Sequence, residues 1–130
     1  MTSLVSSYDA ALFDLDGVIY LGPNAIDGVA RSLAQLRERG IRLGFVTNNA
    51  ARTPVAVAEH LRELGIRADD SDVVNSTQAM VRMLHKELPA GAKLLVVGTD
   101  ALVSQLAEGG FVPVSTLEEN PVAVVQGYHP

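Results

Sequence analysis

The chain contains no cysteine, which excludes disulfide bonds, thiolate catalysis and thiolate metal sites. Any bound metal must therefore have oxygen or imidazole ligands, and because the three histidines are scattered, oxygen ligands are the better prediction. No apolar run approaches the roughly 18 residues needed to span a bilayer, and Met1 to Ser7 lacks the basic start and apolar middle of a secretory signal. We therefore expect a cytoplasmic protein without a membrane partner.

Basic residues are also few. The 130 residues carry a formal net charge of -5, and the densest basic cluster is Arg37, Arg39 and Arg42. This balance argues against nucleic acid or an anionic membrane as a partner. With 48% hydrophobic residues, the chain is long enough for one core and should form one domain or parts of two.

Apolar runs alternate with helical patterns, which indicates an α/β fold. In the first half of the chain, the pattern predicts a strand buried on both faces over Ala10 to Leu15 and then a helix that ends at Gly40 and has Ile26, Val29, Leu33 and Leu36 on its apolar side. It next predicts a strand over Ile41 to Val46 and a helix that begins at Thr53 and Pro54 and ends at Gly65. The second half predicts a helix from Asn75 to Leu88, a strand over Lys93 to Val97, a helix over Ala101 to Glu108, and strands over Phe111 to Val114 and Val122 to Val125. This alternation predicts parallel strands with right-handed crossovers and helices on both faces, a doubly wound Rossmann-like sheet.

Two carboxylates stand where the first strand runs into a turn, at Asp14 and Asp16, with Gly17 next. Asp and Gly often occupy such positions simply as turn formers. A calcium-binding loop is a second alternative, but its spacing would require oxygen ligands at Val18 and Ala25.

The functional interpretation makes Asp14 a nucleophile and Asp16 a general acid and base. An ionised Asp in line with a phosphorus atom can take the phosphoryl group covalently. A second carboxylate can protonate the leaving alkoxide and later deprotonate water. Because these charges and a phosphate repel one another, the pair calls for a hard divalent cation, and Mg²⁺ is the natural choice. Gly17 would permit a tight turn between the acids and the helix after them.

A polar trio, Thr47, Asn48 and Asn49, follows the second strand. A hydroxyl, amide side chains and free backbone N–H groups can hold a phosphoryl oxygen without competing as nucleophiles. Thr and Asn at the junction of a strand and a loop more often have a structural role. The polar trio therefore supports phosphate binding only in combination with Asp14 at the end of a neighbouring strand. Parallel strands bring their carboxyl ends to one edge, so we expect nucleophile and phosphate holder to meet there.

These segments together resemble the haloacid dehalogenase-like hydrolases, whose first motif is an apolar strand ending in Asp-x-Asp-Gly and whose second is an apolar strand ending in Ser or Thr. The runs Asp14 to Tyr20 and Phe45 to Ala50 are similar to the branch with a large α/β cap, which includes nitrophenyl, pyridoxal phosphate and glycerol 3-phosphate phosphatases. The similarity extends to Val73 to Ser76, Leu95 to Thr99 and Val122 to Gly127.

The resemblance implies a magnesium-dependent phosphatase of small phosphate monoesters. It makes Asp14 the nucleophile and a metal ligand, and Asp16 the acid and base that also gives its backbone carbonyl to Mg²⁺. Thr47 and Asn48 are implied phosphate holders, with Asn49 and Gly17 beside them. It also implies two domains, with residues 1–75 beginning the catalytic core and residues 76–130 beginning the cap.

Two departures from the family pattern bear on activity. The family's third and fourth motifs, a Lys and an acidic Gly-Asp segment, normally follow the cap, and Lys86 and Lys93 lie in the wrong region for the former. The chain ends at Pro130, almost directly after an apolar strand, so we expect an N-terminal portion that binds Mg²⁺ weakly and turns over poorly by itself. The other departure is His129, which follows Tyr128 where the family usually has an acidic residue.

Two other classes of function remain as alternatives. A non-catalytic fragment or binding module with the same fold would account for the missing motifs. A phospho-accepting receiver domain has similar length, but it needs an acceptor Asp where this chain has Thr47. The incomplete sheet also leads us to hypothesise a domain-swapped or edge-paired homodimer, because unpaired strand edges and uncovered apolar faces invite self-association.

Overall fold

The structure is a computed structural model that describes residues 4–128. The chain forms two compact units. The first runs as far as Thr47 and resumes over Pro54–Val74, whereas the second comprises Asn48–Thr53 and begins again at Asn75. The polypeptide therefore passes from one unit to the other three times.

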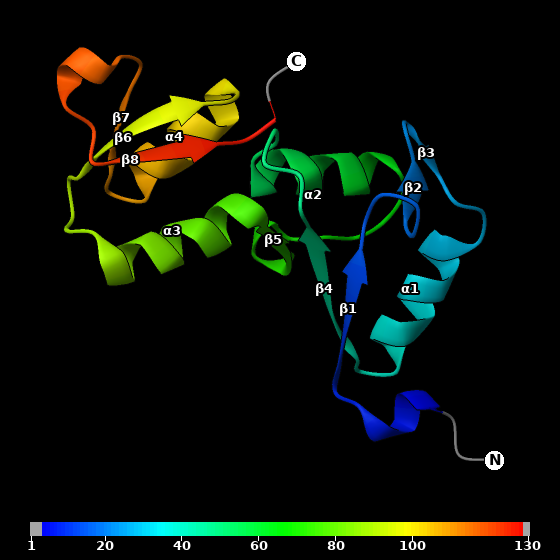
Figure 1. The fold of residues 1–130 in the computed structure, drawn as a ribbon. Helices are drawn as coiled ribbons and strands as arrows, with labels where there is room; N and C mark the ends of the chain where they lie inside the picture. The colour runs from blue at the N-terminus through cyan, green and yellow to red at the C-terminus, as the bar shows by residue number, and fades with distance from the viewer. Residues whose placement is uncertain (1–3, 129–130) are drawn as a thin grey trace. The chain divides into compact units, whose positions relative to one another are not determined.

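The first unit contains a three-stranded sheet in the order β1-β4-β5, a two-stranded hairpin and two α-helices (Figure 1). Its elements are η1 (Leu4–Ser7), β1 (Ala10–Asp14), β2 (Tyr20–Leu21), β3 (Asn24–Ala25), α1 (Val29–Glu38), β4 (Arg42–Thr47), α2 (Pro54–Glu63), η2 (Asp70–Asp72) and β5 (Val73–Asn75). Strands β1 and β4 run parallel, as predicted, and Figure 1 shows them side by side. The last residue of β5, Asn75, already belongs to the second unit.

Local sequence signals set the helix ends in this unit. Gly40 adopts a φ of 80° after α1, a conformation that glycine takes without steric cost, and its N–H donates to the Arg37 carbonyl at 2.9 Å. Helix α2 begins at Pro54, as predicted, because proline at the first helical position gives up an N–H that has no partner within the helix.

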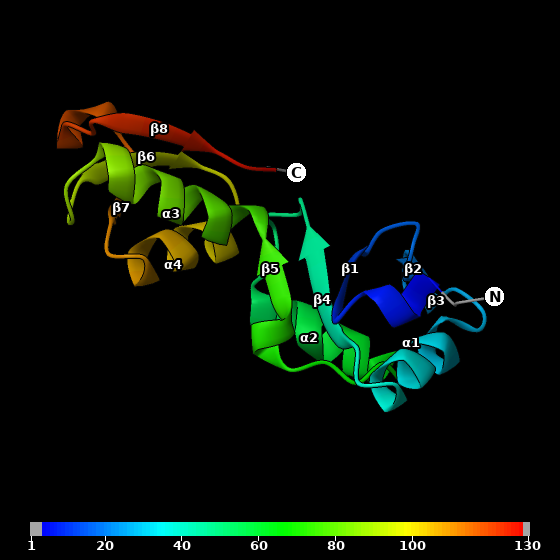
Figure 2. The ribbon, with the colours of Figure 1, turned by 90° about the horizontal axis from the view of Figure 1, so that it is seen from below.

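The core of the first unit lies on one face of its sheet, where α1 and α2 pack (Figure 2). Its fully buried members include Leu15, Phe45 and Leu61. On the other face, Leu12 is 75% exposed and Val46 is 42% exposed. The prediction that the first strand is buried on both faces is therefore wrong for the part of the chain that the structure describes.

The strand order explains this difference. Helices reach the second face of a doubly wound sheet only after the strand order reverses, because right-handed crossovers in one direction place their helices on the same side. Here the order advances from β1 to β4 to β5 without reversal, so α1 and α2 share a face. The α/β class with an incomplete parallel sheet is confirmed, and the hypothesised homodimer stays a prediction.

The second unit has a three-stranded parallel sheet in the order β7-β6-β8 with two helices. Its elements are α3 (Ser76–Glu87), β6 (Lys93–Val97), α4 (Asp100–Glu108), β7 (Val112–Val114), η3 (Leu117–Glu119) and β8 (Ala123–Gln126). Both helices contribute to a core that contains Leu94, Leu102 and Leu106. Each predicted strand and helix of this half is confirmed within about two residues at its ends.

Helix N-termini differ in how they are capped in the second unit. The side chain of Asn75 accepts the N–H of Gln78 at 2.9 Å, and the Gln78 side chain accepts the N–H of Asn75 at 3.1 Å, which forms a capping box. Thr99 lies at the N-cap of α4, but its side chain makes no capping hydrogen bond. Within residues 4–128, no helix has both the length and the apolar character to cross a bilayer.

Candidate active site

The two predicted site strands end at the same edge of the first unit's sheet. Asp14 is the last residue of β1, and Thr47 is the last residue of β4. In the parallel register Asp14 pairs with Val46, so Thr47 stands one position beyond the residue opposite Asp14. The structure therefore places Asp14 and Thr47 at the carboxyl ends of adjacent parallel strands, and the expectation that their side chains share one site stays a prediction.

The turn after β1 is fixed to the core by its apolar residues. Leu15, Ile19 and Tyr20 are at most 7% exposed, and the N–H of Ile19 donates to the Leu15 carbonyl at 2.8 Å. Asp14 and Asp16 alternate with these buried positions, and both are exposed. The apolar residues thus hold the turn in place and present the two carboxylates to solvent, where a ligand can reach them.

Gly17 closes the turn between the two acids and the hairpin. Its φ is 82°, and an added Cβ would meet no atom within 4 Å, so backbone conformation rather than space calls for glycine. Its N–H donates to the Tyr20 carbonyl at 2.8 Å. The chain continues from this turn into β2 and β3 and not directly into a helix, which corrects the expected order.

The oxygen atoms at Asp14 and Asp16 suit a magnesium ion. One carboxylate oxygen of Asp14 accepts the N–H of Leu15 at 2.9 Å, and the Asp16 side chain is exposed. Mg²⁺ binds proteins through one or two carboxylates and fills its remaining positions with water and substrate phosphate. Within residues 4–128, no group of three or more acidic or histidine side chains is placed to hold a metal ion, and the assignment of Asp14 and Asp16 as metal ligands stays a prediction.

The other two residues of the polar trio belong to the second unit. Asn48 and Asn49 are exposed and begin the segment Asn48–Thr53. The Asn49 side-chain carbonyl accepts the N–H of Ala51 at 2.8 Å, an interaction that stabilises a local turn. Their assignment to phosphate binding, like that of Gly17, stays a prediction.

Other acidic residues of the first unit serve its structure. Asp72 accepts a hydrogen bond from Arg37 at 3.1 Å, and Asp70 lies 3.4 Å from Arg62.

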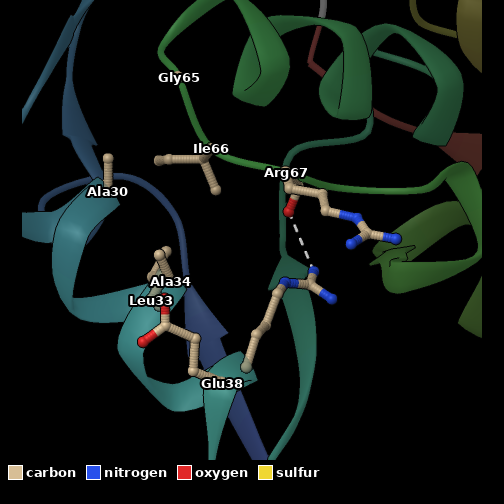
Figure 3. A pocket seen from close by; sticks show the side chains of 8 residues that line it. Ala30, Leu33, Ala34, Glu38, Gly65, Ile66 and Arg67 are labelled. Atoms are coloured by element: carbon tan, nitrogen blue, oxygen red, sulfur yellow. Dashed lines mark hydrogen bonds between the residues drawn. The ribbon is translucent and has the colours of Figure 1, made fainter.

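A pocket of about 260 Å³ lies between α1 and the segment after α2 (Figure 3). Arg37, which lines this pocket, also donates a hydrogen bond to the Arg67 carbonyl. None of the predicted site residues lines this pocket, and His129 lies outside the described residues.

One buried polar contact, between Asn75 and Gln105, was not predicted from the sequence. The amides of Asn75 and Gln105, which are 1% and 7% exposed, are joined by a hydrogen bond of 2.7 Å. The available signal was the pair Asn75 and Gln78, whose three-residue spacing is that of a capping box. That pattern reveals the cap but not the partner thirty residues away.

Comparison with known sequences identifies the family. The sequence model of the haloacid dehalogenase-like hydrolases matches residues 11–112, a span that includes Asp14, Asp16 and Thr47. The chain belongs to the haloacid dehalogenase-like hydrolase family. Membership confirms the family predicted from the two motifs and disfavours the receiver-domain alternative.

Three relatives show how similar this haloacid dehalogenase-like chain is to proteins of known activity or structure. The D-glycerol 3-phosphate phosphatase of Mycobacterium tuberculosis is 44% identical over 98% of the chain and 35% of its own length. The acid sugar phosphatase of Staphylococcus aureus is 38% identical over 83% of the chain and 41% of its own length. The crystal structure of a glycerol phosphate phosphatase from M. tuberculosis in complex with magnesium superposes with a TM-score of 0.91 at 44% identity, covering 98% of the chain and 38% of that structure. The chain thus spans about two fifths or less of these relatives.

Proposed function

We propose that this chain carries the nucleophile and part of the phosphate-binding site of a magnesium-dependent phosphatase for small phosphate monoesters. The observation that carries the proposal is the β1–β4 register, in which Asp14 and Thr47 end adjacent parallel strands. The relatives' names support a phosphorylated polyol or sugar as substrate, and glycerol 3-phosphate is the first candidate.

The proposed reaction has two displacements. A carboxylate oxygen of Asp14 attacks phosphorus, the ester P–O bond breaks, and Asp16 gives its proton to the leaving alkoxide. A water molecule then attacks the aspartyl phosphate, Asp16 takes the water's proton, and the bond from phosphorus to Asp14 breaks. The products are an alcohol and inorganic phosphate, and both aspartates return to their starting states.

Charge repulsion is the main obstacle to the first displacement, because the Asp14 carboxylate and the phosphate are both anionic. The carboxylate of Asp14 and an oxygen of Asp16 would hold Mg²⁺, and the bound ion would offset this repulsion. The exposure of both acids leaves room for the waters and phosphate oxygen that such an ion retains. Thr47 is proposed to donate its hydroxyl to a phosphoryl oxygen.

The proposal extends to the organisation of the chain. Residues 1–75 begin the catalytic core, and residues 76–130 begin a cap that covers the site and selects the substrate. The family's Lys and second acidic motif are expected elsewhere in the complete enzyme, so the chain by itself is proposed to bind Mg²⁺ weakly and to turn over poorly.

The test of function is phosphate release by the longest form of the protein. We expect release from glycerol 3-phosphate and nitrophenyl phosphate with Mg²⁺, loss of activity with EDTA and recovery when Mg²⁺ is restored. Equal rates with and without EDTA would contradict the metal requirement. Tight binding of a partner chain without any hydrolysis would instead favour the non-catalytic alternative.

Thr47→Val tests the proposed phosphate contact. Valine has nearly the shape of threonine but no hydroxyl, so we expect kcat/KM to fall about 10- to 100-fold, the cost of one hydrogen bond to a charged group. Thr47→Ser keeps the hydroxyl and should lose much less. Because Thr47 is only 4% exposed, urea unfolding of both variants must accompany the kinetics. Equal losses for Val and Ser would assign Thr47 to packing.

A further inference from the structure

The segment Asn48–Thr53 is hydrogen-bonded to the start of α3 near both of its ends. The Ser76 hydroxyl donates to the Asn48 carbonyl at 3.0 Å, and the Asn75 amide donates to the Arg52 carbonyl at 3.0 Å. All of these residues belong to the second unit. Asn75 and Ser76, two consecutive residues at the N-terminus of α3, therefore hold the loop Asn48–Thr53 near both of its ends.

The side chain of Asn75 is buried, and both its nitrogen and its oxygen make hydrogen bonds. Its Nδ2 group donates both to the Arg52 carbonyl and to the Gln105 side-chain carbonyl, while its Oδ1 accepts the N–H of Gln78. Only 1% of the residue is exposed, so water does not compete for these groups. An amide is well suited here, because it supplies two donors and an acceptor without charge.

Gln105 of α4 fixes the orientation of the Asn75 amide. Its Oε1 accepts from Asn75 at 2.7 Å, and its Nε2 donates to the Ala101 carbonyl one helical turn earlier at 3.0 Å. Both ends of the Gln105 amide are thus engaged, which defines which way it faces. A chain of bonds therefore runs from the backbone of α4 through two buried amides to the backbone of the loop.

We propose that Asn75 and Ser76 are positioning residues that hold the loop carrying Asn48 and Asn49 in the conformation that binds phosphate. Gln105 supports them by orienting the Asn75 amide. The inference rests on the proposed function, since it deepens the account of the same phosphate site. It does not make Asn75 or Ser76 catalytic residues, because they contact the loop and not the reacting atoms.

The two roles of Asn75 can be separated by substitution. Asn75→Asp keeps an oxygen acceptor for the N–H of Gln78, and aspartate caps helices as well as asparagine does. It removes both N–H donors and sets a carboxylate against the carbonyls of Arg52 and Gln105. Gln78→Ala is the matched control, because it removes one arm of the capping box and leaves both loop contacts intact. Ser76→Ala deletes only the bond to Asn48.

Two measurements on the longest form of the protein test the inference. The first is hydrogen exchange of the loop amides from Ala50 to Thr53, and the second is the inhibition constant for inorganic phosphate. For Asn75→Asp we expect loop exchange to quicken and phosphate inhibition to weaken, each by roughly tenfold or more, and for Ser76→Ala by a few-fold. Gln78→Ala should leave phosphate inhibition at the wild-type value. The KM of the ester should rise more than kcat falls.

Each outcome decides a different question. Wild-type loop exchange in both Asn75→Asp and Ser76→Ala would overturn the anchoring. A freed loop with unchanged phosphate inhibition would overturn its role in binding. If Asn75→Asp does not fold, Ser76→Ala decides both points. A wild-type protein that hydrolyses no ester refutes the proposed function, whereas an active wild type with active, unaffected variants refutes only this inference.

Discussion

Asn in place of Asp14 is expected to reduce phosphate release by roughly 10³-fold or more, because a neutral amide cannot form the covalent phosphoryl intermediate. The replacement has nearly the same shape, and Asp14 is exposed, so the fold should be retained. The side-chain carbonyl of Asn can still accept the N–H of Leu15, as Asp14 does now. The measurement is steady-state release of inorganic phosphate from glycerol 3-phosphate by the longest form of the protein.

Asp9→Asn provides the matched control for Asp14→Asn. Asp9 precedes β1 and is exposed, so it presents a carboxylate at the opposite end of the same strand. Its link to β4 uses the backbone carbonyl, which accepts the N–H of Arg42 and is unaffected by the substitution. We expect near wild-type activity from this variant. Substantial turnover by a folded Asp14→Asn protein would remove Asp14 as the nucleophile, as would a phosphoryl group trapped on another residue.

Asp16→Asn is expected to lower turnover of glycerol 3-phosphate by about 10²- to 10⁴-fold, the usual contribution of a general acid and base. An alkoxide leaves poorly without a proton, whereas nitrophenolate leaves readily. With nitrophenyl phosphate the first displacement should therefore survive, and the second should remain slow because water activation is impaired. Rapid mixing should then show a burst of nitrophenol equal to the amount of enzyme, followed by slow turnover.

The control for this variant is Asp27→Asn, which changes an exposed carboxylate in the turn before α1. It should show neither the loss nor the burst. A folded Asp16→Asn protein with equal losses on both esters and no burst would assign Asp16 to metal binding alone. Full activity on glycerol 3-phosphate would exclude it from the chemistry.

The positions of Asp14 and Thr47 at the ends of neighbouring strands follow from the sequence because their signals are local. Two apolar runs that each end in polar residues predict parallel strands, and the carboxyl ends of parallel neighbours lie at one edge. Asp14 and Thr47 could therefore be placed at the same edge of the sheet from the sequence. Pro54 and Gly40 likewise fix helix ends through their own backbone preferences.

The errors involve properties that no local signal encodes. Exposure of Leu12 depends on the order of strands in the sheet, because that order decides which face the helices cover. The hairpin of β2 and β3 has two residues in each strand, too few for an alternating pattern to appear. The amide pair joins Asn75, the N-cap of α3, to Gln105 of α4, and only the packing of α3 and α4 brings them together.

The three passages of the polypeptide between the units matter to anyone who recombines genes of this family. A chimera made with a single junction at Asn75 would join the loop Asn48–Thr53 of one parent to the α3 start of another. A faithful exchange needs two inserts, one for that hexapeptide and one for everything from Asn75 onward. A natural crossover between the hexapeptide and α3 would likewise separate segments that are hydrogen-bonded to each other. The hexapeptide and the first residues of α3 are therefore expected to be inherited together.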